Sequence, residues 1–396
     1  MILDGIRVLD FTRVFAGPAA TQLLGDLGAE VIKIEARGGD EARHYGKPPS
    51  ADAGHADSAP FNALNRNKKS LGLDLKAEAG RAVALRLVPG ADVVVHNFRP
   101  GVMERLGLGH EALSALNPRL IYAEFSAYGD RGPLRDVGAN DLALQAHSGL
   151  ISITGAPGHD PVRCGTAVID LHGSLALVAG IMGALYHRTQ TGQGQRVQSS
   201  LLLSAAHLMG YFYTEYWEDG TQRAPMGTAN HLSVPNQAFP AKDGQVVIIA
   251  STDPQWQRVA RVLGDPRLMD ARFATVLSRK ANRAALVALL SEITAQHTAA
   301  ELAARLGAEK VTCSKVNSIG EAAECAQLAA VGGRLRLDGP RAIDSIAPPV
   351  EMAANGPVPL APPPSVGQHS RALLAEAGYS EGEIDALLRD GAVFEG

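Results

Sequence analysis

Asp170 can serve either a structural or a chemical purpose in this 396-residue sequence. It stands between the short segment Thr166–Ile169 and a long apolar run that begins near Leu171 and is typical of a helix. An aspartate there can cap the helix, because its carboxylate accepts hydrogen bonds from the amides of the first turn. A helix N-terminus also keeps a carboxylate ionised, and an ionised carboxylate among apolar residues is a usable nucleophile. The pattern leaves both interpretations open.

A basic cluster lies at Asn65–Ser70, where Arg66, Lys68 and Lys69 supply three cations in six residues. A solvated basic turn would account for this composition. A functional interpretation is that the cluster attracts the phosphates of a nucleotide, because arginine is suited to bidentate phosphate contacts. The pattern alone does not decide between the two.

A second segment, Asn97–Gly101, follows the predicted strand Asp92–His96. It combines an aromatic ring, Phe98, with a cation, Arg99, and Arg105 comes one helical turn later. Open α/β sheets bind ligands at the carboxyl ends of their strands, so this segment and the first basic cluster could together hold an adenine nucleotide.

A third candidate is the turn from Leu9–Thr12 to Gly17–Pro18, which leads from a predicted strand into a predicted helix. It lacks the GxGxxG pattern, so a nicotinamide cofactor is not expected. Simple packing explains the turn, although the helix N-terminus could also meet a phosphate. The sequence likewise has no HExxH or GxSxG pattern, which removes support for zinc hydrolases and serine hydrolases.

The elements that must position these residues alternate between strands and helices. This alternation predicts βαβ units and a parallel sheet covered by helices, a doubly wound α/β core. A polar stretch rich in Gly, Pro and Asp, residues 36–59, is predicted to be a surface loop. The predicted strands are Arg7–Asp10, Glu30–Glu35, Gly72–Leu75 and Asp92–His96, and the predicted helices between them are Gly17–Leu27 and Glu78–Leu87.

The later chain predicts a division into two domains. A large domain over 1–200 is completed by 330–396, and a small domain spans 225–320, with linkers at 201–224 and 321–345. The small domain has a predicted strand near 244–250 and predicted helices over 281–306. The proline-rich stretch 340–364 is predicted to be an extended strap that crosses a surface. The apolar helix from Asp170 to Arg188 is predicted to be buried.

Composition limits the partners. The chain is 46% apolar and 20% charged with a net charge of −4, which gives no general attraction for nucleic acid or anionic membranes. Three cysteines without metal-like spacing predict a reduced compartment and no metal site. The N-terminus shows no signal pattern, and the apolar run Ser174–Tyr186 is too short to cross a bilayer. A cytoplasmic enzyme is expected.

Taken in order, several motifs resemble those of the class III CoA-transferases, a family that includes formyl-CoA transferase, carnitine CoA-transferase and, as a divergent branch, α-methylacyl-CoA racemase. The resemblance extends over nearly the whole chain. The matching motifs are Val8–Phe11 with Ala16–Pro18, Leu27–Glu35, Asn65–Ser70 with Leu73–Lys76, Asn97–Gly101, Gln145–Ala146 with Ser148–Gly149, Gly165 with Asp170, and Thr191–Gln195.

The resemblance implies a role for individual residues. The family's aspartate nucleophile maps to Asp170, with acyl-CoA as substrate and no tightly bound cofactor or metal. Backbone amides at the start of the following helix, and others from a small-domain loop, are expected to stabilise the oxyanions. The residues implied for coenzyme A are Val14, Ala16, Arg37, Lys68, Lys69, Leu73, Lys76, Asn97, Phe98, Arg105 and Tyr128. Those implied for the acid substrate are Phe15, Asn140, Gln145, Gly227 and Asn230.

Departures from the family pattern separate its branches. Phe15 stands where formyl-CoA transferase has a glutamine, which argues against oxalate or formate chemistry. Gly138–Asp141 stands where the racemase has Gly-His-Asp, and Asn140 cannot act as a base near neutral pH. Transfer of CoA to a carboxylic acid is therefore the favoured activity, with racemisation and non-catalytic CoA binding as alternatives. The family also implies a Rossmann-like large domain and an interlocked homodimer.

Overall fold

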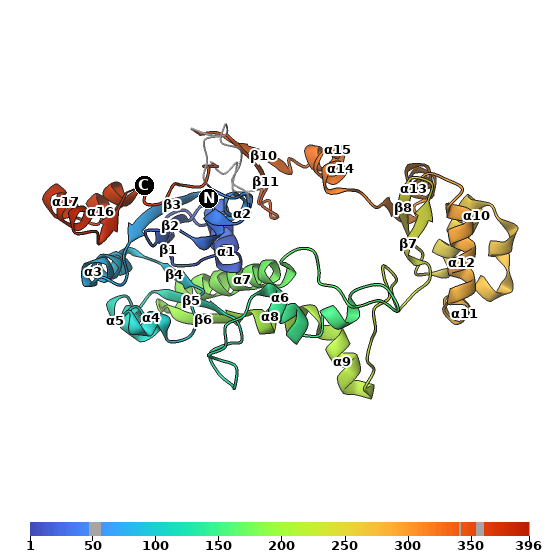
Figure 1. Cartoon of the computed structure of the whole chain (residues 1–396), viewed down its shortest axis with the longest axis horizontal. Helices are drawn as coiled ribbons and strands as arrows, with labels where there is room; N and C mark the ends of the chain where they lie inside the picture. Colours follow the sequence, from blue (N-terminus) through green and yellow to red (C-terminus); the bar gives the residue numbers. More distant parts are fainter. Residues whose placement is uncertain (47–56, 340–341, 354–359, 396) are drawn as a thin grey trace. The chain divides into compact units, whose positions relative to one another are not determined.

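The computed structural model describes residues 1–46, 57–339, 342–353 and 360–395 (Figure 1). The chain forms two compact units. The larger comprises Met1–Leu150, Arg163–Gln222 and Ala330–Gly396, and the smaller comprises Ile151–Val162 and Arg223–Ala329. Ile151–Val162, which the sequence analysis placed in the large domain, thus groups with the smaller unit, where the amide of Gly227 donates to the carbonyl of Gly155 at 2.7 Å.

The larger unit is built on a seven-stranded sheet with the order β12-β3-β2-β1-β4-β5-β6. Every neighbouring pair is parallel except β12 and β3, which are antiparallel. The predicted mixed α/β fold with a mainly parallel sheet is confirmed. The strands are β1 (Arg7–Asp10), β2 (Glu30–Glu35), β3 (Lys68–Leu73), β4 (Val93–His96), β5 (Ile121–Ser126), β6 (Gln195–Ser200) and β12 (Val393–Phe394).

Successive strand residues bury their side chains on opposite faces of this sheet. Val8 and Val31 belong to one hydrophobic cluster, whereas their chain neighbours Leu9 and Ile32 belong to another. Side chains alternate between the faces of a strand, so a strand buried on both faces must be apolar throughout. The β-branched runs of the sequence therefore mark the central strands of a sheet covered on both sides.

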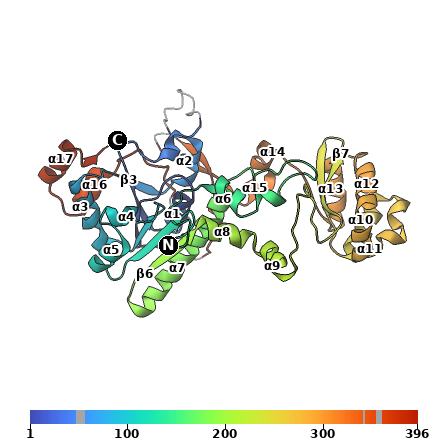
Figure 2. The same ribbon diagram turned by 60° about the horizontal axis from the view of Figure 1, so that its bottom comes forward.

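Helices from distant parts of the chain cover the two faces. Cluster residues of α1, α7 and α8 pack on one face, and those of α3, α5, α16 and α17 pack on the other. The C-terminal helices α16 and α17 lie beside α3 in both Figure 1 and Figure 2. The helices of the larger unit are α1 (Ala16–Asp26), α2 (Ala59–Leu64), α3 (Glu78–Leu87), α4 (Val102–Arg105), α5 (His110–Leu116), α6 (Asp141–His147), α7 (Val168–Thr191), α8 (Leu201–Leu208), α9 (Gly210–Asp219), α16 (Ser370–Glu376) and α17 (Glu381–Arg389).

The C-terminal segment completes the sheet. Val393 pairs with Leu73, and a Cβ at Gly72 would lie 2.5 Å from the carbonyl oxygen of Phe394. Only glycine allows this approach between two backbones. The last strand therefore closes the edge of the sheet at β3.

The predicted linkers contain regular structure. Residues 201–224 include α8 and α9, and α8 contributes Leu201 and Ala205 to a core cluster of the larger unit. Residues 321–345 include α14 (Ile319–Ala323) in part, α15 (Ala326–Ala330) and the antiparallel pair β10 (Arg334–Leu337) and β11 (Ile343–Ile346). Of the predicted loop over 36–59 and strap over 340–364, residues 47–56, 340–341 and 354–359 lie outside the described residues.

Helix α7 is buried on only one side, which corrects the prediction for this apolar segment. Leu177 and Ile181 are fully buried, but Leu175 is 50% exposed and Tyr186 is 68% exposed. The helix has 24 residues, enough by length and composition to cross a membrane. Its buried side packs in the same core cluster as α1, as expected for a core helix of a globular unit.

The smaller unit has its own hydrophobic core, which includes Phe239, Trp256 and Leu290. A three-stranded antiparallel sheet with the order β7-β8-β9 packs with helices around that core. Its elements are β7 (Asn236–Ala241), β8 (Gly244–Ile249), α10 (Asp253–Leu263), α11 (Val276–Ala281), α12 (Arg283–Thr294), α13 (Ala299–Ala308) and β9 (Thr312–Lys315).

Candidate functional site

The strand order of the large sheet reverses between β1 and β4, since β2 and β3 extend on one side and β5 and β6 on the other. Such a reversal opens a crevice at the carboxyl ends of the strands, where α/β proteins bind ligands. Two segments meet there. The Asn97 side chain, after β4, accepts from the amide of Arg13 at 2.8 Å and donates to its carbonyl at 2.7 Å, which fixes the turn after β1.

A cavity of about 310 Å³ lies at this crevice. Its volume falls in the range of small-molecule sites. It brings together seven residues to which the family resemblance gives a role, Val14, Phe15, Ala16, Asn97, Phe98, Asn140 and Asp170. Its remaining lining was not assigned to an acid-binding or catalytic role: Arg13, Glu41, Arg99, Phe125, Ser126, Ala127, Ala139 and Leu201.

Asp170 is not the cap of helix α7. The N-cap position is Ala167, so Asp170 is the third helical residue. The cap comes from another helix, because Asp141 at the start of α6 accepts from the amides of Ile169 at 2.7 Å and Asp170 at 3.1 Å. The N-cap interpretation is therefore wrong, and the carboxylate of Asp170 is left to face the cavity.

The amides at the start of α7 are all occupied. Besides those bonded to Asp141, the amide of Val168 donates to Thr166 at 2.9 Å and that of Leu171 donates to Ala167 at 3.0 Å. The expectation that these amides stabilise an oxyanion is therefore not met.

Gln145 supports Asp141 rather than lining the cavity. Its side-chain amide donates to Asp141 and its oxygen accepts from the amide of Cys164 at 2.8 Å. It is 1% exposed, so the predicted contact with the acid substrate is wrong for this residue. Gln145 instead holds the carboxylate that caps α7.

Burial raises the pKa of Asp170 to about 7, and the negative charge of Asp141 adds to the increase. These effects outweigh the helix N-terminus, contrary to the expectation that its position would keep Asp170 ionised. Among the described residues, no donor is hydrogen-bonded to this carboxylate. The carboxylate of Asp170 therefore changes protonation near neutral pH and forms no hydrogen bond that would tie it to the described part of the chain.

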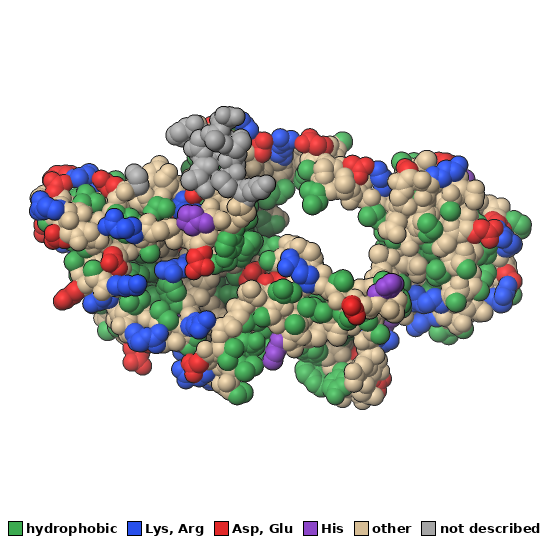
Figure 3. Space-filling view, in the orientation of Figure 1, with side chains coloured by type: hydrophobic (Ala, Val, Ile, Leu, Met, Phe, Trp, Pro, Cys, Tyr) green, Lys and Arg blue, Asp and Glu red, His purple; other side chains and the backbone are tan. Residues whose placement is uncertain are grey.

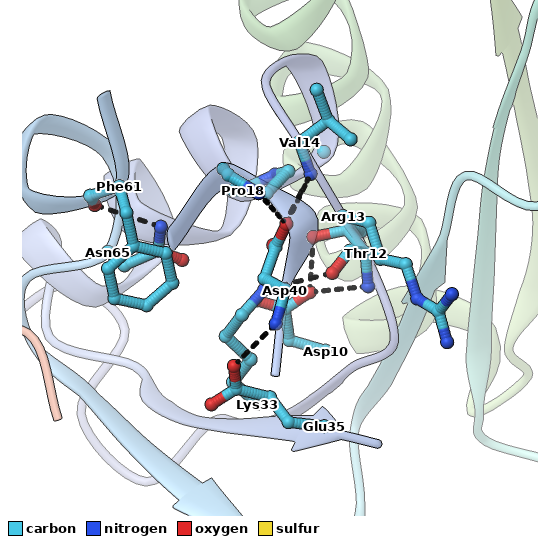
Figure 4. A network of polar contacts seen from close by, with 12 residues as sticks. Asp10, Thr12, Arg13, Val14, Pro18, Lys33, Glu35, Asp40, Phe61 and Asn65 are labelled. Atoms are coloured by element: carbon cyan, nitrogen blue, oxygen red, sulfur yellow. Dashed lines mark hydrogen bonds and ion pairs between the residues drawn. The ribbon is translucent and has the colours of Figure 1, made fainter. Parts of the chain in front are cut away.

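A buried network of ion pairs and hydrogen bonds also supports the turn after β1 (Figure 4). Asp10 is fully buried; its carboxylate pairs with the Lys68 ammonium at 3.0 Å and accepts from the Thr21 hydroxyl at 2.7 Å. Burial alone would raise the pKa of Asp10, but the charges of Lys68 and Lys33 lower it below its ordinary value. Asp10 is thus a permanently charged structural group.

The second half of this network positions Val14. Lys33 donates to the carbonyl of Thr12 at 2.9 Å and pairs with Asp40 at 2.8 Å. Asp40 in turn accepts from the amide of Val14 at 3.0 Å, and Val14 has a φ of 71°. A β-branched residue with positive φ is strained, so the network supplies the contacts that hold it.

The basic cluster Asn65–Ser70 is mainly structural, which corrects both interpretations of it. Lys68 is buried and also donates to Pro18 and Asn65, and burial lowers its pKa to about 8. Arg66 is 2% exposed and pairs with Asp26 at 2.5 Å. The predicted phosphate contact of Lys68 is therefore wrong, because its ammonium has three oxygen partners inside the protein.

Lys69 and Leu73 also lie away from the cavity. Lys69 is 42% exposed and pairs with Glu30, the first residue of β2, at the amino-terminal end of that strand. Leu73 is 1% exposed and packs in a core cluster. Their predicted side-chain contacts with coenzyme A are therefore not supported.

Three other predicted cations are exposed at the carboxyl side of the sheet. Arg37 follows β2, Lys76 follows β3, and Arg105 ends the short helix after β4. Carboxyl ends of parallel strands meet at one edge of a sheet, so these charges and the cavity share that edge. Tyr128 lines a neighbouring cavity of about 370 Å³, which also includes Phe98.

Gly227 and Asn230 belong to the smaller unit. The Asn230 side chain accepts from the amide of Leu232 at 2.7 Å, and Gly227 has a φ of 64°. Their predicted contacts with the acid substrate stay predictions.

Comparison with known proteins decides the family. Residues 3–370 match the sequence model of the family described as CoA-transferase family III. The chain belongs to CoA-transferase family III. It is 36% identical to succinyl-CoA:glutarate CoA-transferase of Mus musculus over 99% of this chain and 90% of the relative. It is 38% identical to acetyl-CoA:oxalate CoA-transferase of Acetobacter aceti over 83% of this chain and 84% of the relative.

A solved structure shares the fold. The CAIB/BAIF family protein from Brucella suis has a TM-score of 0.86 and 33% identity, covering 95% of this chain and 99% of that chain. The predicted family resemblance is thus confirmed. As a family III CoA-transferase, the protein is an enzyme whose substrates are an acyl-CoA and a carboxylic acid.

Proposed function

We propose that the protein transfers coenzyme A between carboxylic acids through covalent intermediates on Asp170. The observation that supports this most directly is the state of that side chain. It is partly buried at a cavity in the sheet crevice, has a pKa raised to about 7, and accepts no hydrogen bond from the described residues. A poorly solvated carboxylate of this kind is a nucleophile when ionised.

The reaction begins when an Asp170 carboxylate oxygen attacks the thioester carbonyl of the donor, which forms a mixed anhydride and expels CoA thiolate. The thiolate then attacks the aspartyl carbonyl, releasing the donor acid and leaving an aspartyl-CoA thioester. The acceptor carboxylate attacks the aspartyl carbonyl of this thioester, which forms a second anhydride and expels CoA thiolate again. The thiolate finally attacks the acceptor's acyl carbon, which regenerates Asp170 and yields the new acyl-CoA.

The acyl-CoA is proposed to lie along the carboxyl edge of the large sheet. Val14, Ala16, Asn97 and Phe98 line the cavity and are proposed to contact the arm that bears the thioester. The exposed cations Arg37, Lys76 and Arg105 lie further along the same edge and are proposed to bind the phosphates. Tyr128 offers an aromatic surface beside Phe98.

Oxyanion stabilisation is proposed to come from a loop of the smaller unit, as the family resemblance implies, whereas Gly227 and Asn230 are the residues predicted there to contact the acid substrate. The start of α7 lacks a free amide for this purpose, since its first four amides donate to Asp141, Thr166 and Ala167. A donor from elsewhere is therefore needed at the thioester oxygen.

Transfer is favoured over racemisation by the position of Asn140. Its side-chain oxygen caps α6 by accepting from the amide of Ala143 at 3.1 Å, and the residue lines the cavity. An amide cannot exchange a substrate proton near neutral pH. The second proton-transfer group that racemisation requires is therefore not supplied at this position.

A homodimer is proposed from the exposed apolar side chains of α7 and α9. Leu175 is 50% exposed and Tyr186 is 68% exposed on α7, and Trp217 on α9 is 75% exposed. Figure 3 shows apolar side chains gathered at the surface over α9. Apolar surface on this scale favours an interaction site, and a second copy fits the family expectation of an interlocked dimer. Light scattering at nanomolar concentration tests this, because interlocked chains do not dissociate on dilution.

A donor-by-acceptor screen tests the proposed activity. Acetyl-CoA and succinyl-CoA are each incubated with small mono- and dicarboxylic acids, and new acyl-CoA products are detected by mass spectrometry. Formation of acceptor-CoA in proportion to enzyme supports the proposal. Incorporation of deuterium at the α-carbon without an acceptor would indicate racemisation, and CoA binding without either product would indicate a non-catalytic protein.

A further inference from the structure

We infer that the acid substrate is a dicarboxylate whose second carboxylate binds the guanidinium groups of Arg13 and Arg99. This inference rests on the proposed transfer through Asp170 and specifies the class of acid. Both arginines line the same cavity as Asp170. One carboxylate of the substrate would react at Asp170 while the other pairs with the arginines.

Arg13 is presented to the cavity by a fixed backbone. Its amide and carbonyl are both bonded to the Asn97 side chain, at 2.8 and 2.7 Å. Its guanidinium lies over the Phe98 ring, 4.9 Å from the centroid, and extends away from the Asp10 network in Figure 4. A guanidinium stacked on an aromatic face keeps its in-plane donors available for a carboxylate.

Gly138 leaves the space in which the guanidinium of Arg99 lies. A Cβ at Gly138 would lie 2.4 Å from Nη2 of Arg99, so the guanidinium occupies space that any side chain at 138 would take. The residues that follow, Ala139 and Asn140, line the cavity with Asp170. Gly138 therefore allows the Arg99 charge to lie against the wall that carries the acid-binding residues.

Neither charge is neutralised by the part of the chain that the structure describes. No described residue forms an ion pair with Arg13 or Arg99, whereas the buried Arg66 pairs with Asp26. Glu41 also lines the cavity, and both it and Arg99 are exposed, but no ion pair joins Glu41 to either arginine among the described residues. Two guanidinium groups beside one cavity, without a carboxylate of their own, are suited to bidentate recognition of a substrate carboxylate.

The cavity also suits the body of such an acid and disfavours the phosphates of CoA. Phe125, Ala127 and Leu201 provide apolar wall for a short methylene chain. The pantetheine arm separates the thioester from the phosphates, so cations that share the cavity of the reacting carboxylate are too near it to meet them. The exposed cations outside this cavity, Arg37 and Lys76, are better placed for that role.

The test compares glutarate with pentanoate, which has the same number of carbons and one carboxylate, using acetyl-CoA as the donor. The variants are Arg13→Gln, Arg99→Gln and Gly138→Ala, which keeps the charge but displaces Arg99. Arg272→Gln is the matched control, because Arg272 is 61% exposed and lines neither this cavity nor the neighbouring one that contains Tyr128. Wild type is expected to favour glutarate in kcat/KM.

Each arginine variant is expected to lower kcat/KM for glutarate by about tenfold to hundredfold, the effect of losing a charge-assisted hydrogen bond. The values for pentanoate and the KM for acetyl-CoA should stay close to those of wild type. Gly138→Ala should show a smaller loss in the same direction, and Arg272→Gln none. This pattern would support the inference.

Two outcomes would overturn it. Equal use of glutarate and pentanoate by wild type would remove the dicarboxylate preference while leaving the proposed transferase intact. A raised KM for acetyl-CoA, with equal losses for both acids, would assign the arginines to coenzyme A. If no acid is converted, calorimetry of glutarate with CoA-loaded protein decides: binding lost in both arginine variants supports the inference, and no binding to wild type overturns it.

Discussion

Asp10 is a fully buried carboxylate of the larger unit and Asp170 is a partly buried one, and their surroundings differ in charge. Asp10 contacts the ammonium of Lys68 and two threonine hydroxyls, and its pKa is lowered. Asp170 has the like charge of Asp141 nearby, and its pKa is raised to about 7. One environment keeps the carboxylate ionised and hydrogen-bonded, and the other raises its pKa and leaves it without a hydrogen-bond donor among the described residues.

The difference shows that, within one unit, one carboxylate holds the backbone of the cavity in place and another is proposed to react. The Asp10 network fixes the turn through Thr12 and Val14, which forms one wall of the cavity. Asp170 contributes its backbone amide to the cap made by Asp141 but keeps its side chain free of such bonds among the described residues. Burial alone therefore does not identify a catalytic carboxylate; the charges around it do.

The largest expected effect comes from removing the carboxylate of Asp170, the proposed nucleophile. Asp170→Ala should lower exchange by more than about a thousandfold, because the covalent carrier is lost. Asp170→Asn should do the same while preserving shape. Circular dichroism should show an intact fold in both. Exchange by Asp170→Ala above about a thousandth of wild type would exclude Asp170 as the nucleophile.

The opposite result is expected for the structural carboxylate. Lys68→Met leaves Asp10 buried without its closest cation and should reduce the free energy of unfolding by about 3–5 kcal/mol. Urea unfolding measures this loss. The KM for acyl-CoA should not change for the folded fraction. A raised KM with unchanged stability would instead place Lys68 at a phosphate.

Sequence reasoning was most successful where one pattern had one physical cause. The strands Arg7–Asp10 and Glu30–Glu35 have the predicted bounds, because β-branched runs bounded by turns can be buried only in a sheet covered on both faces. The family resemblance placed Asp170, Val14 and Phe98, and the structure brings them to one cavity.

It was less successful where a role depends on contacts distant in the sequence. Lys68 has the type and neighbours of a phosphate ligand, and only its pairing with Asp10, 58 residues away, shows that it is structural. The cap of α7 comes from Asp141, 28 residues before Ile169. One feature of the sequence could have indicated that Arg13 lines the cavity: it directly precedes Val14 in the turn after the first strand.

Stability should depend on pH through Asp170. The folded-state pKa of this group is raised above its ordinary value, so its contribution is full below that ordinary value and is lost as pH rises through about 7. Asp170→Asn removes this loss. The variant should therefore gain stability relative to wild type between pH 5 and pH 8, by on the order of a few kcal/mol. Urea unfolding that shows no change in the difference between these pH values would contradict the raised pKa.

The pH dependence of activity should change in Asp141→Asn. This substitution keeps a side-chain oxygen that can accept from the amides of α7 but removes the charge that helps to raise the pKa of Asp170. The rate with a fixed donor should rise with pH as Asp170 ionises, and the variant's rise should occur at lower pH than that of wild type. A pH–rate profile of Asp141→Asn that coincides with that of wild type would show that Asp141 does not raise the pKa of Asp170.

The smallest effect is expected at the exposed cations. Arg105→Ala should raise the KM for acyl-CoA by about fivefold and weaken its dependence on salt, because an exposed ion pair contributes little. The turnover number should hardly change. Salt titration of the KM provides the measurement, and an unaltered salt dependence would remove Arg105 from the phosphate site.

The covalent role of Asp170 is tested most directly by trapping. Wild-type protein is incubated with acyl-CoA and hydroxylamine, digested, and analysed by peptide mass spectrometry. Attack of hydroxylamine on the aspartyl carbonyl of the anhydride or of the aspartyl-CoA thioester should leave a hydroxamate on Asp170 alone, only when the donor is present, and in proportion to lost activity. Exchange that continues without any donor-dependent modification of Asp170, or modification at a different carboxylate, would contradict the account.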